Sequence, residues 1–216
     1  MTSSPLSPYL RDFERLADLE TSVNSLLSSH GQEATFHHVK AVAQKAAELA
    51  ERFSGNVEEV SAAAWLHDIS AIIPNRERIA VAQGLRLEVL PEEADFPMII
   101  HQKLSAALAE EAFGVTSQAV LSAISCHTTL KANASKSDHI VFVADKIAWD
   151  QAGTPPYLPD LLVALEASIE AASLVYLDYL WEMRARLKVL HPWAKAAREA
   201  LRADVSKLQT DKSLRF

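Results

Sequence analysis

Residues 64–69 read Ala64-Trp65-Leu66-His67-Asp68-Ile69, which places an imidazole and a carboxylate side by side after an apolar segment. In the middle of a helix, neighbouring side chains point about 100° apart, but near a helix end both can turn toward one cation. An imidazole with a carboxylate suits a first-row metal, and iron, manganese, cobalt and zinc are all compatible. Taken alone, the pair also fits a plainer interpretation, in which Asp68 caps a helix and His67 packs in the core.

The chain on either side of this pair has the pattern of helices. Gly and Pro together make up only 14 of the 216 residues, and such a scarcity of turn formers favours long helices over many short strands. Apolar residues recur at helical spacing, and Asn56 with Glu59 resembles a capping box. Residues 70–97 are punctuated by Pro and Gly and predict short helices with loops. The longer predicted helices cover residues 8–29, 35–53, 57–67, 97–113, 116–127 (with Thr116 as the cap), 158–187 and 192–209.

The run at residues 140–147 is apolar and contains β-branched residues, so a buried strand is one interpretation. We predict a buried helix instead, because everything around the run is helical. The expected fold class is therefore all-α, a helical bundle. We expect its main domain to cover residues 31–209, with a helical N-terminal extension at 1–30 and a C-terminal tail at 210–216.

Composition and charge exclude several classes of function. The formal net charge of −7 argues against a broad nucleic-acid-binding surface. Cys126 is the only cysteine, so the chain can build neither an internal disulfide nor a thiolate zinc cluster. No apolar run approaches the roughly 18 residues that a membrane span requires, and no signal peptide is visible. We therefore expect a cytoplasmic protein without nucleic-acid or membrane partners.

Four further residues of the metal-ligating type lie beside apolar stripes. His38 is on the apolar edge of the predicted helix 35–53, and Asp145 lies inside the apolar run at 140–147. A buried carboxylate needs a partner or a metal, because an unpaired buried charge is costly. His101 and His127 lie at the ends of helices with apolar faces of their own. A helical bundle can bring such residues together in its core.

With these residues in place, the chain resembles the YqeK-type family, the HD-domain symmetrical bis(5′-nucleosyl)-tetraphosphatases of the HD superfamily of metal-dependent phosphohydrolases. The resemblance spans roughly residues 33–201. The last two of the stretches that carry it distinguish this family from HD domains in general. The matching stretches are residues 38–43, residues 64–69, residues 123–129 together with 140–147, and residues 190–192 together with 196–198.

The resemblance implies a cleft with a divalent metal centre of one or two ions, often iron, that splits diadenosine tetraphosphate into two ADP. Manganese, cobalt or zinc would also suit these ligands. By this resemblance the metal ligands are His38, His67, Asp68 and Asp145. The catalytic residues are Asp68, His101 and His127, and the substrate-binding residues are His101, His127 and Thr128.

The chemistry that these roles imply is physically consistent. A bound divalent metal can lower the pKa of its water to about 7, and two metals can neutralise phosphoryl oxygens during in-line attack. Asp68 is the natural residue to bridge the metals or to orient the water. His101 and His127 can protonate a leaving phosphate or bind its oxygens.

The chain departs from the family pattern at several phosphate-contacting positions. Thr35 stands where the family usually has an Arg, and Ser70-Ala71 stand where it has a Lys. Leu130 replaces a Gly after the His-Thr-Thr stretch, and residues 148–150 replace an acidic-Pro stretch that leads to an Arg. The metal site is thus better supported than the substrate. Two alternatives follow: an HD hydrolase of another nucleotide or phosphoester, and a nucleotide-binding regulator with little turnover.

Several other residues receive structural interpretations. Lys146 is expected to be salt-bridged or solvated, and His139 is expected at the surface. Trp149 follows Asp145 by one helical turn and could stack on a nucleobase. The stripe with Tyr176 and Tyr179 fits a homodimer surface as well as it fits the core.

Overall fold

The computed structural model of the protein describes residues 3–149 and 151–213, and side chains as far as residue 204. These residues form helices and loops without a strand, which confirms the all-α fold class. The first helices are η1 (Ser7–Tyr9), α1 (Leu19–Ser28), α2 (Glu33–Arg52), α3 (Val57–Leu66) and η2 (Ile69–Ile72). The middle of the chain forms α4 (Arg78–Gly84), α5 (Pro91–Asp95), α6 (His101–Phe113), α7 (Gln118–Cys126) and α8 (Lys136–Ile147). The last helices are α9 (Leu158–Leu165), α10 (Ile169–Glu182) and α11 (Pro192–Ser213).

Helix α8 lies at the centre of the bundle. Ser135 begins it with a capping box, in which Asp138 N donates to the Ser135 hydroxyl at 3.2 Å and Ser135 N donates to the Asp138 carboxylate at 2.8 Å. The side chains of residues 140–144 are completely buried. The run at 140–147 is therefore a buried helix, as predicted, because the surrounding helices cover it on all sides.

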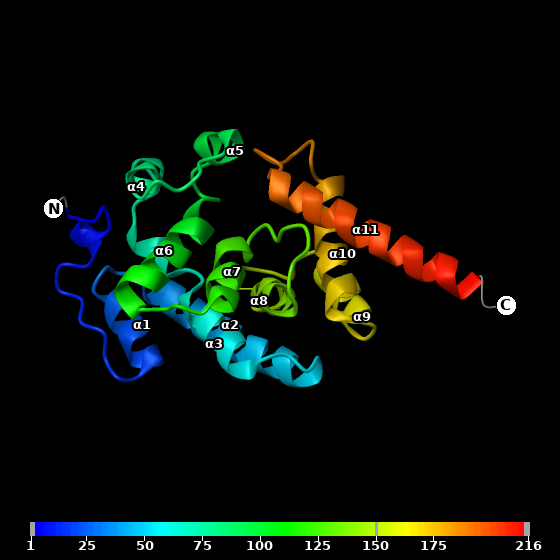
Figure 1. Cartoon of the computed structure of the whole chain (residues 1–216), viewed down its shortest axis with the longest axis horizontal. Coiled ribbons are helices and arrows are strands. Elements are labelled where there is room, and N and C mark those ends of the chain that lie inside the picture. Colours follow the sequence, from blue (N-terminus) through cyan, green and yellow to red (C-terminus); the bar gives the residue numbers. More distant parts are fainter. Residues whose placement is uncertain (1–2, 150, 214–216) are drawn as a thin grey trace.

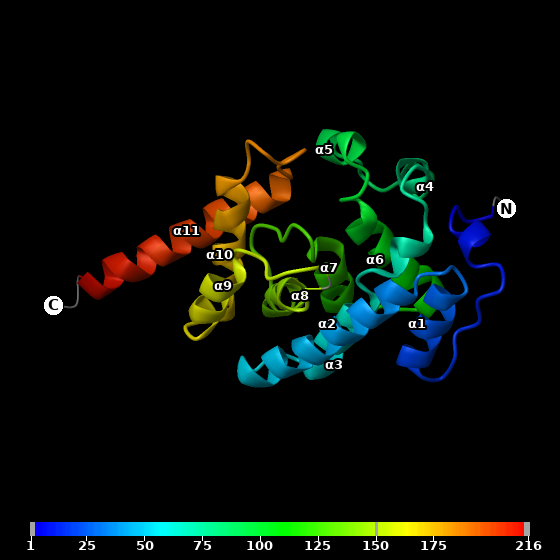
Figure 2. The same ribbon diagram turned by 180° about the vertical axis from the view of Figure 1, so that it is seen from behind.

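The other helices surround α8 in two groups (Figures 1 and 2). Helices α2, α3 and α7 pack on it from one side, and α10 packs on it from the other. Helices α9 and α11 pack against α10, and α11 continues beyond the rest of the bundle. The ends of the chain lie at opposite ends of the long axis. None of the described helices is both long enough and apolar enough to cross a membrane.

The predicted helix at 8–29 is wrong over its first half. Apart from the short turn η1, residues up to Asp18 are irregular, and the helix begins where the Asp18 carboxylate accepts a hydrogen bond from Thr21 N at 2.7 Å. The apolar residues in this half do not share one buried face. The ring of Phe13 lies 5.2 Å from that of Phe113, whereas Leu16 is exposed.

Several other helix boundaries also differ from the prediction, since α6 begins at His101 instead of residue 97 and α10 ends at Glu182 instead of residue 187. Ser117, rather than Thr116, caps α7 by accepting a hydrogen bond from Val120 N. The predicted helix at 158–187 is broken into α9 and α10, because Ser168 is extended and accepts from Ala171 N as a new N-cap. The expected tail at 210–216 falls partly within α11 and partly outside the described residues.

Candidate metal centre

Six candidate ligands from five helices lie close together beside α8. His38 comes from the middle of α2, and His67 and Asp68 come from the turn that joins α3 to η2. His101 begins α6, His127 follows the last residue of α7, and Asp145 lies near the end of α8. The structure thus brings together all six residues that the sequence singled out.

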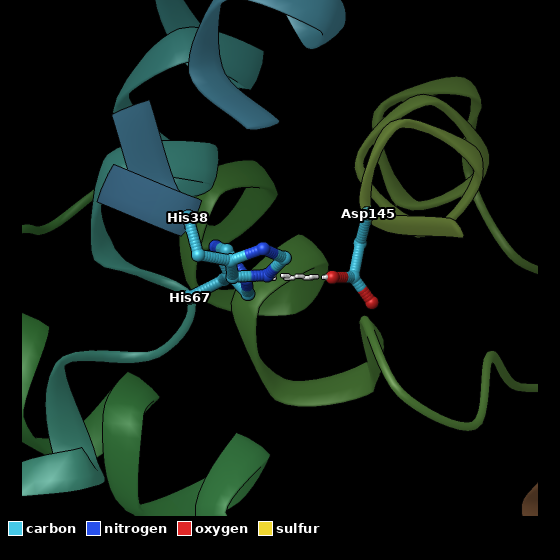
Figure 3. A group of neighbouring side chains, drawn as sticks. All are labelled: His38, His67 and Asp145. Carbon is cyan, nitrogen blue, oxygen red and sulfur yellow. Dashed lines mark hydrogen bonds and ion pairs between the residues drawn. The ribbon is translucent and has the colours of Figure 1, made fainter. Parts of the chain in front are cut away.

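A first group of donor atoms surrounds one position between α2, α3 and α8 (Figure 3). His38 Nε2 lies 3.0 Å from Asp145 Oδ1 and 3.3 Å from His67 Nε2. Asp68 Oδ2 lies 3.7 Å from His67 Nε2 and 4.0 Å from His38 Nε2. Ligands about 2.1 Å from a shared ion lie about 3.0 Å apart when adjacent in an octahedron and about 4.2 Å when opposite. His38, His67 and Asp145 therefore fit one coordination sphere, and Asp68 Oδ2 lies beside it.

The other carboxylate oxygen of Asp68 faces a second group. Asp68 Oδ1 lies 3.1 Å from His101 Nε2 and 3.4 Å from His127 Nε2, and the two imidazole nitrogens are 2.9 Å apart. His67 also lies close enough to share a cation with Asp68 and His127. Asp68 consequently stands between two ligand groups, with one oxygen directed at each.

The tautomers of three histidines fit a bound cation. The Nδ1 atoms of His67, His101 and His127 lie 2.6–2.8 Å from the carbonyl oxygens of Ala64, Met98 and Ile124. A carbonyl can only accept, so each Nδ1 donates and each Nε2 presents a lone pair to the centre. Two such lone pairs, on His101 and His127, face each other at 2.9 Å. Neutral acceptors at that distance repel unless a proton or a cation is shared between them, and this donor set therefore fits a metal.

The electrostatics of the centre keep its carboxylates charged. Burial alone would raise the pKa of Asp68, but the imidazoles of His67 and His101 hold it well below its usual value. Burial likewise opposes ionisation of Asp145, but its pKa is held well below the usual range mainly by Lys146, with His38 and His67 adding to the effect. Two carboxylates that stay charged inside the protein require positive charge nearby.

Burial lowers the pKa of His127 from 6.5 to about 4, and this outweighs its hydrogen bond with Asp68. The pKa of His67 is also lowered, chiefly by burial. Both imidazoles are therefore neutral near pH 7 in the metal-free protein. A neutral imidazole is a ligand for a metal or an acceptor of a hydrogen bond, and is a poor proton donor.

Thr128 and an unpredicted partner, Gln102, complete the His127 side of the centre. The Thr128 hydroxyl lies 3.1 Å from His101 Nε2 and 3.0 Å from His127 Nε2. Gln102 is completely buried, and its side-chain oxygen accepts from Thr128 N while its amide donates to the Thr129 hydroxyl. The helix that supplies His101 thereby also fixes the loop that carries Thr128. A Gln beside a His gives no pattern that would have revealed this role.

Two cations lie beside the centre, and only one of them was singled out by the sequence. Lys146 is buried and ion-paired with Asp145, as expected, and its ammonium also donates to the His127 carbonyl. Arg78, at the start of α4, lines a hollow of about 200 Å³ together with Asp68, Ala71, Met98 and His101. A second hollow, of about 250 Å³, is also lined by Asp68, together with Asp145, Lys146 and Trp149.

Two other positions differ from expectation or from the family pattern. His139 is buried rather than at the surface, because α10 covers it and its Nδ1 lies 2.9 Å from the Ser173 hydroxyl. Leu130, where the family usually has Gly, has φ of 56°. That left-handed conformation costs a non-glycine residue about 1–2 kcal/mol. The complete burial of the Leu130 side chain offsets this cost.

The metal-free protein is expected to lose stability as the pH falls from 7 to 5. Unfolded His127 takes up a proton near pH 6.5, whereas folded His127 does so only near pH 4. The unfolded state therefore gains protons first, and the shift corresponds to a loss of about 3 kcal/mol by pH 4. The depressed carboxylates add a further loss only below their unfolded pKa of 3.8.

Urea denaturation with a chelator at pH 7 and pH 5 measures this effect. His127→Asn should reduce the dependence on pH, whereas substitution of the exposed His30 should leave it unchanged. A free energy of unfolding that stays constant between pH 7 and pH 5 would show that His127 is not buried in its neutral form.

Comparison with known proteins yields one family and several relatives. The HD domain family matches residues 35–150. An uncharacterized protein encoded in the pepC 5′ region of Lactococcus lactis subsp. cremoris is 45% identical over 144 residues, which cover 67% of this chain and 73% of that protein.

Symmetrical bis(5′-nucleosyl)-tetraphosphatases are more distant relatives. Those of Staphylococcus aureus and Bacillus subtilis are each 29% identical, over 53% and 54% of this chain. The matched parts span 59% and 63% of those two enzymes. The fold is also that of the crystal structure of a predicted HD superfamily hydrolase involved in NAD metabolism from Clostridium acetobutylicum. The TM-score is 0.78 at 23% identity, over 85% of this chain and 97% of that one.

Proposed function

The chain belongs to the HD domain family of metal-dependent phosphohydrolases, and on that premise we propose that it hydrolyses diadenosine tetraphosphate symmetrically to two ADP. The observation that carries this proposal is the position of Asp68, which faces a ligand group with each of its oxygens and lines two hollows. The relatives named for this activity support the same substrate.

Two hollows of similar size suit a substrate that is cut in its middle. They measure about 200 and 250 Å³, and of the described residues Asp68 alone lines both. A tetraphosphate chain laid across Asp68 would have its central anhydride at the metal centre and one half of the molecule on each side. Cleavage there adds water to one central phosphorus and breaks its bond to the bridging oxygen, which leaves with the second ADP.

The six side chains would hold two ions. Asp68 would be shared by both, with His38 and Asp145 in one ligand group and His101 and His127 in the other. His67 lies within reach of both groups. A bound divalent ion supplies positive charge for phosphoryl oxygens and acidifies a coordinated water to a pKa of about 7. Iron is the ion we favour, and the same ligands accept manganese, cobalt or zinc.

The chain's own groups orient the substrate around this centre. The Thr128 hydroxyl, next to both His101 Nε2 and His127 Nε2, can donate to a phosphate oxygen. Neutral His127 serves as a ligand, since its lowered pKa of about 4 makes it a poor acid near pH 7. Lys146 remains paired with Asp145 and so stabilises a ligand instead of contacting the substrate.

Trp149 is positioned to stack on one nucleobase. Its side chain is 38% exposed and lies between the hollow at Asp145 and another of about 470 Å³ that includes His37 and Ala41. Stacking of a base on an aromatic ring contributes about 1–3 kcal/mol. Trp149→Ala should therefore raise the KM for the dinucleotide by about 5- to 100-fold and leave the KM for a substrate without a base unchanged.

Steady-state kinetics with diadenosine tetraphosphate and with inorganic tetraphosphate, which has no aromatic ring, would separate the two effects. Trp149→Phe keeps an aromatic ring and should retain most of the affinity. An equal rise in KM for both substrates would assign Trp149 to support of the metal centre and not to base recognition.

Analysis of the products tests the proposed reaction. Protein loaded with iron or manganese is incubated with diadenosine tetraphosphate, and the nucleotides are separated by chromatography. ADP as the sole product supports symmetrical cleavage, whereas AMP with ATP would mean that water attacks a different phosphorus. An intact tetraphosphate beside turnover of other nucleotides or phosphoesters would move the protein to a different substrate. Nucleotide binding without any turnover would indicate a regulator.

A further inference from the structure

We propose that Arg78 binds phosphate oxygens in the hollow on the His101 side of the metal centre. Neither the sequence pattern nor the family resemblance points to this residue. The inference rests on the proposed function only in requiring a phosphate-bearing ligand at the centre. Arg78, at the start of α4, would take the place of the Lys that the family usually has where this chain has Ala71.

Arg78 is a buried cation without an anionic partner. It is 7% exposed, and its guanidinium donates from Nε to the Ile73 carbonyl at 3.2 Å and from Nη1 to the Met98 carbonyl at 3.3 Å. Among the described residues, no carboxylate lies within 4.0 Å of it, and Nη2 makes no hydrogen bond. A buried charge held only by carbonyls and the Met98 sulfur is costly, and an anion is the ligand that would compensate it.

The surroundings of Arg78 supply a place for that anion. Arg78 lines the hollow of about 200 Å³ together with Asp68 and His101, and the small side chain of Ala71 leaves part of this hollow open. Burial lowers the pKa of the Arg78 guanidinium, and the carboxylate of Asp68 partly opposes that shift by favouring the charged form. A planar guanidinium matches two oxygens of one phosphate, which makes arginine the usual residue for such contacts.

A shared carbonyl fixes Arg78 relative to the metal centre. The Met98 oxygen accepts from His101 Nδ1 at 2.6 Å and also from Arg78 Nη1. The imidazole that faces Asp68 and the guanidinium that faces the hollow are therefore anchored to the same atom. A phosphate chain bound at His101 would extend along the hollow toward Arg78. Arg78 would then hold the phosphate next to the one that is attacked.

Calorimetric titration of the manganese-loaded full chain with inorganic pyrophosphate tests this role. Arg78→Met should weaken pyrophosphate binding by about 10- to 100-fold, the effect expected for a charged hydrogen-bonded contact. Metal content should stay at the wild-type value. Arg76→Met is the matched control, because Arg76 is two residues away, exposed and paired with Glu77, and this variant should bind pyrophosphate like the wild type.

Pyrophosphate binding by Arg78→Met within twofold of the wild type, at full metal content, would overturn the inference. If Arg78→Met loses metal or melts early, Arg78→Lys provides the test instead. Lysine keeps the positive charge and loses only the planar guanidinium that can contact two phosphate oxygens. Arg78→Lys should bind about 5- to 10-fold more weakly, and wild-type affinity in this variant would overturn the inference. The titration needs no turnover. A protein that binds pyrophosphate through Arg78 and leaves the tetraphosphate intact would refute the proposed substrate alone.

Discussion

Asp68→Ala is expected to abolish hydrolysis, with a fall in kcat on the order of 10³-fold or more. Among the residues that the structure describes, Asp68 alone faces both ligand groups with oxygens, at 3.7 Å from His67 Nε2 and at 3.1 Å from His101 Nε2. Removal of its carboxylate takes a ligand from each proposed ion and leaves the facing imidazoles without a counter-charge. Steady-state turnover and metal content, measured on the same preparation, would show both losses.

Two further variants locate the cause of that loss. Asp68→Asn keeps the shape and one oxygen but removes the charge, so it should retain part of the metal and little turnover. The exposed Asp95 provides the matched control, and Asp95→Ala should behave like the wild type. A variant Asp68→Ala that kept more than a tenth of the wild-type kcat would exclude Asp68 as the bridging carboxylate.

Metal binding is expected to stabilise the fold by about 4 kcal/mol when the free metal concentration is a thousandfold above its dissociation constant. The metal-free core holds the charged carboxylates of Asp68 and Asp145 beside imidazole nitrogens that face one another. A bound cation removes these repulsions, and only the folded protein forms the site that binds it. For a protein of this length, 4 kcal/mol corresponds to a rise in Tm of about 8–16 °C.

Thermal denaturation with a chelator and with added manganese or iron measures the difference. His67→Ala should abolish most of the gain, since His67 lies within reach of both ligand groups. His37→Ala changes an exposed neighbour of a proposed ligand and should keep the full gain. Equal Tm values with and without metal, for protein that retains metal through gel filtration, would contradict a site in the core.

The ligand-type residues of the site were predictable from sequence because their chemistry conflicts with their surroundings. Asp145 inside a fully apolar run and His67 at the end of an apolar helix both demand a partner, and the structure brings them within 3.7 Å of each other. The residues that were missed act through the backbone. Arg78 is held by the carbonyls of Ile73 and Met98, and no spacing in the sequence identifies which carbonyls will meet a guanidinium.

The errors in the fold have a related cause. Apolar spacing predicts a helix at 8–29, but the same residues can be buried one at a time by an irregular segment, as Phe13 is against Phe113. The break before α10 depends on the extended backbone of Ser168, which has φ of −170°. A single Ser between apolar residues is too common in sequences to predict a helix N-cap. Helix α8 was predictable because a continuous buried run surrounded by helices leaves few alternatives.

The metal content of the purified chain tests the central claim most directly. The protein is stripped with chelator, reloaded with iron under anaerobic conditions or with manganese, freed of excess metal, and measured for metal and for protein. We predict two ions per chain for the wild type. We predict at most one for Asp145→Asn, which alters the group around His38 and leaves that around His101 intact. A folded wild-type chain that retains no metal would contradict the account, and a single ion would contradict the bridging role of Asp68.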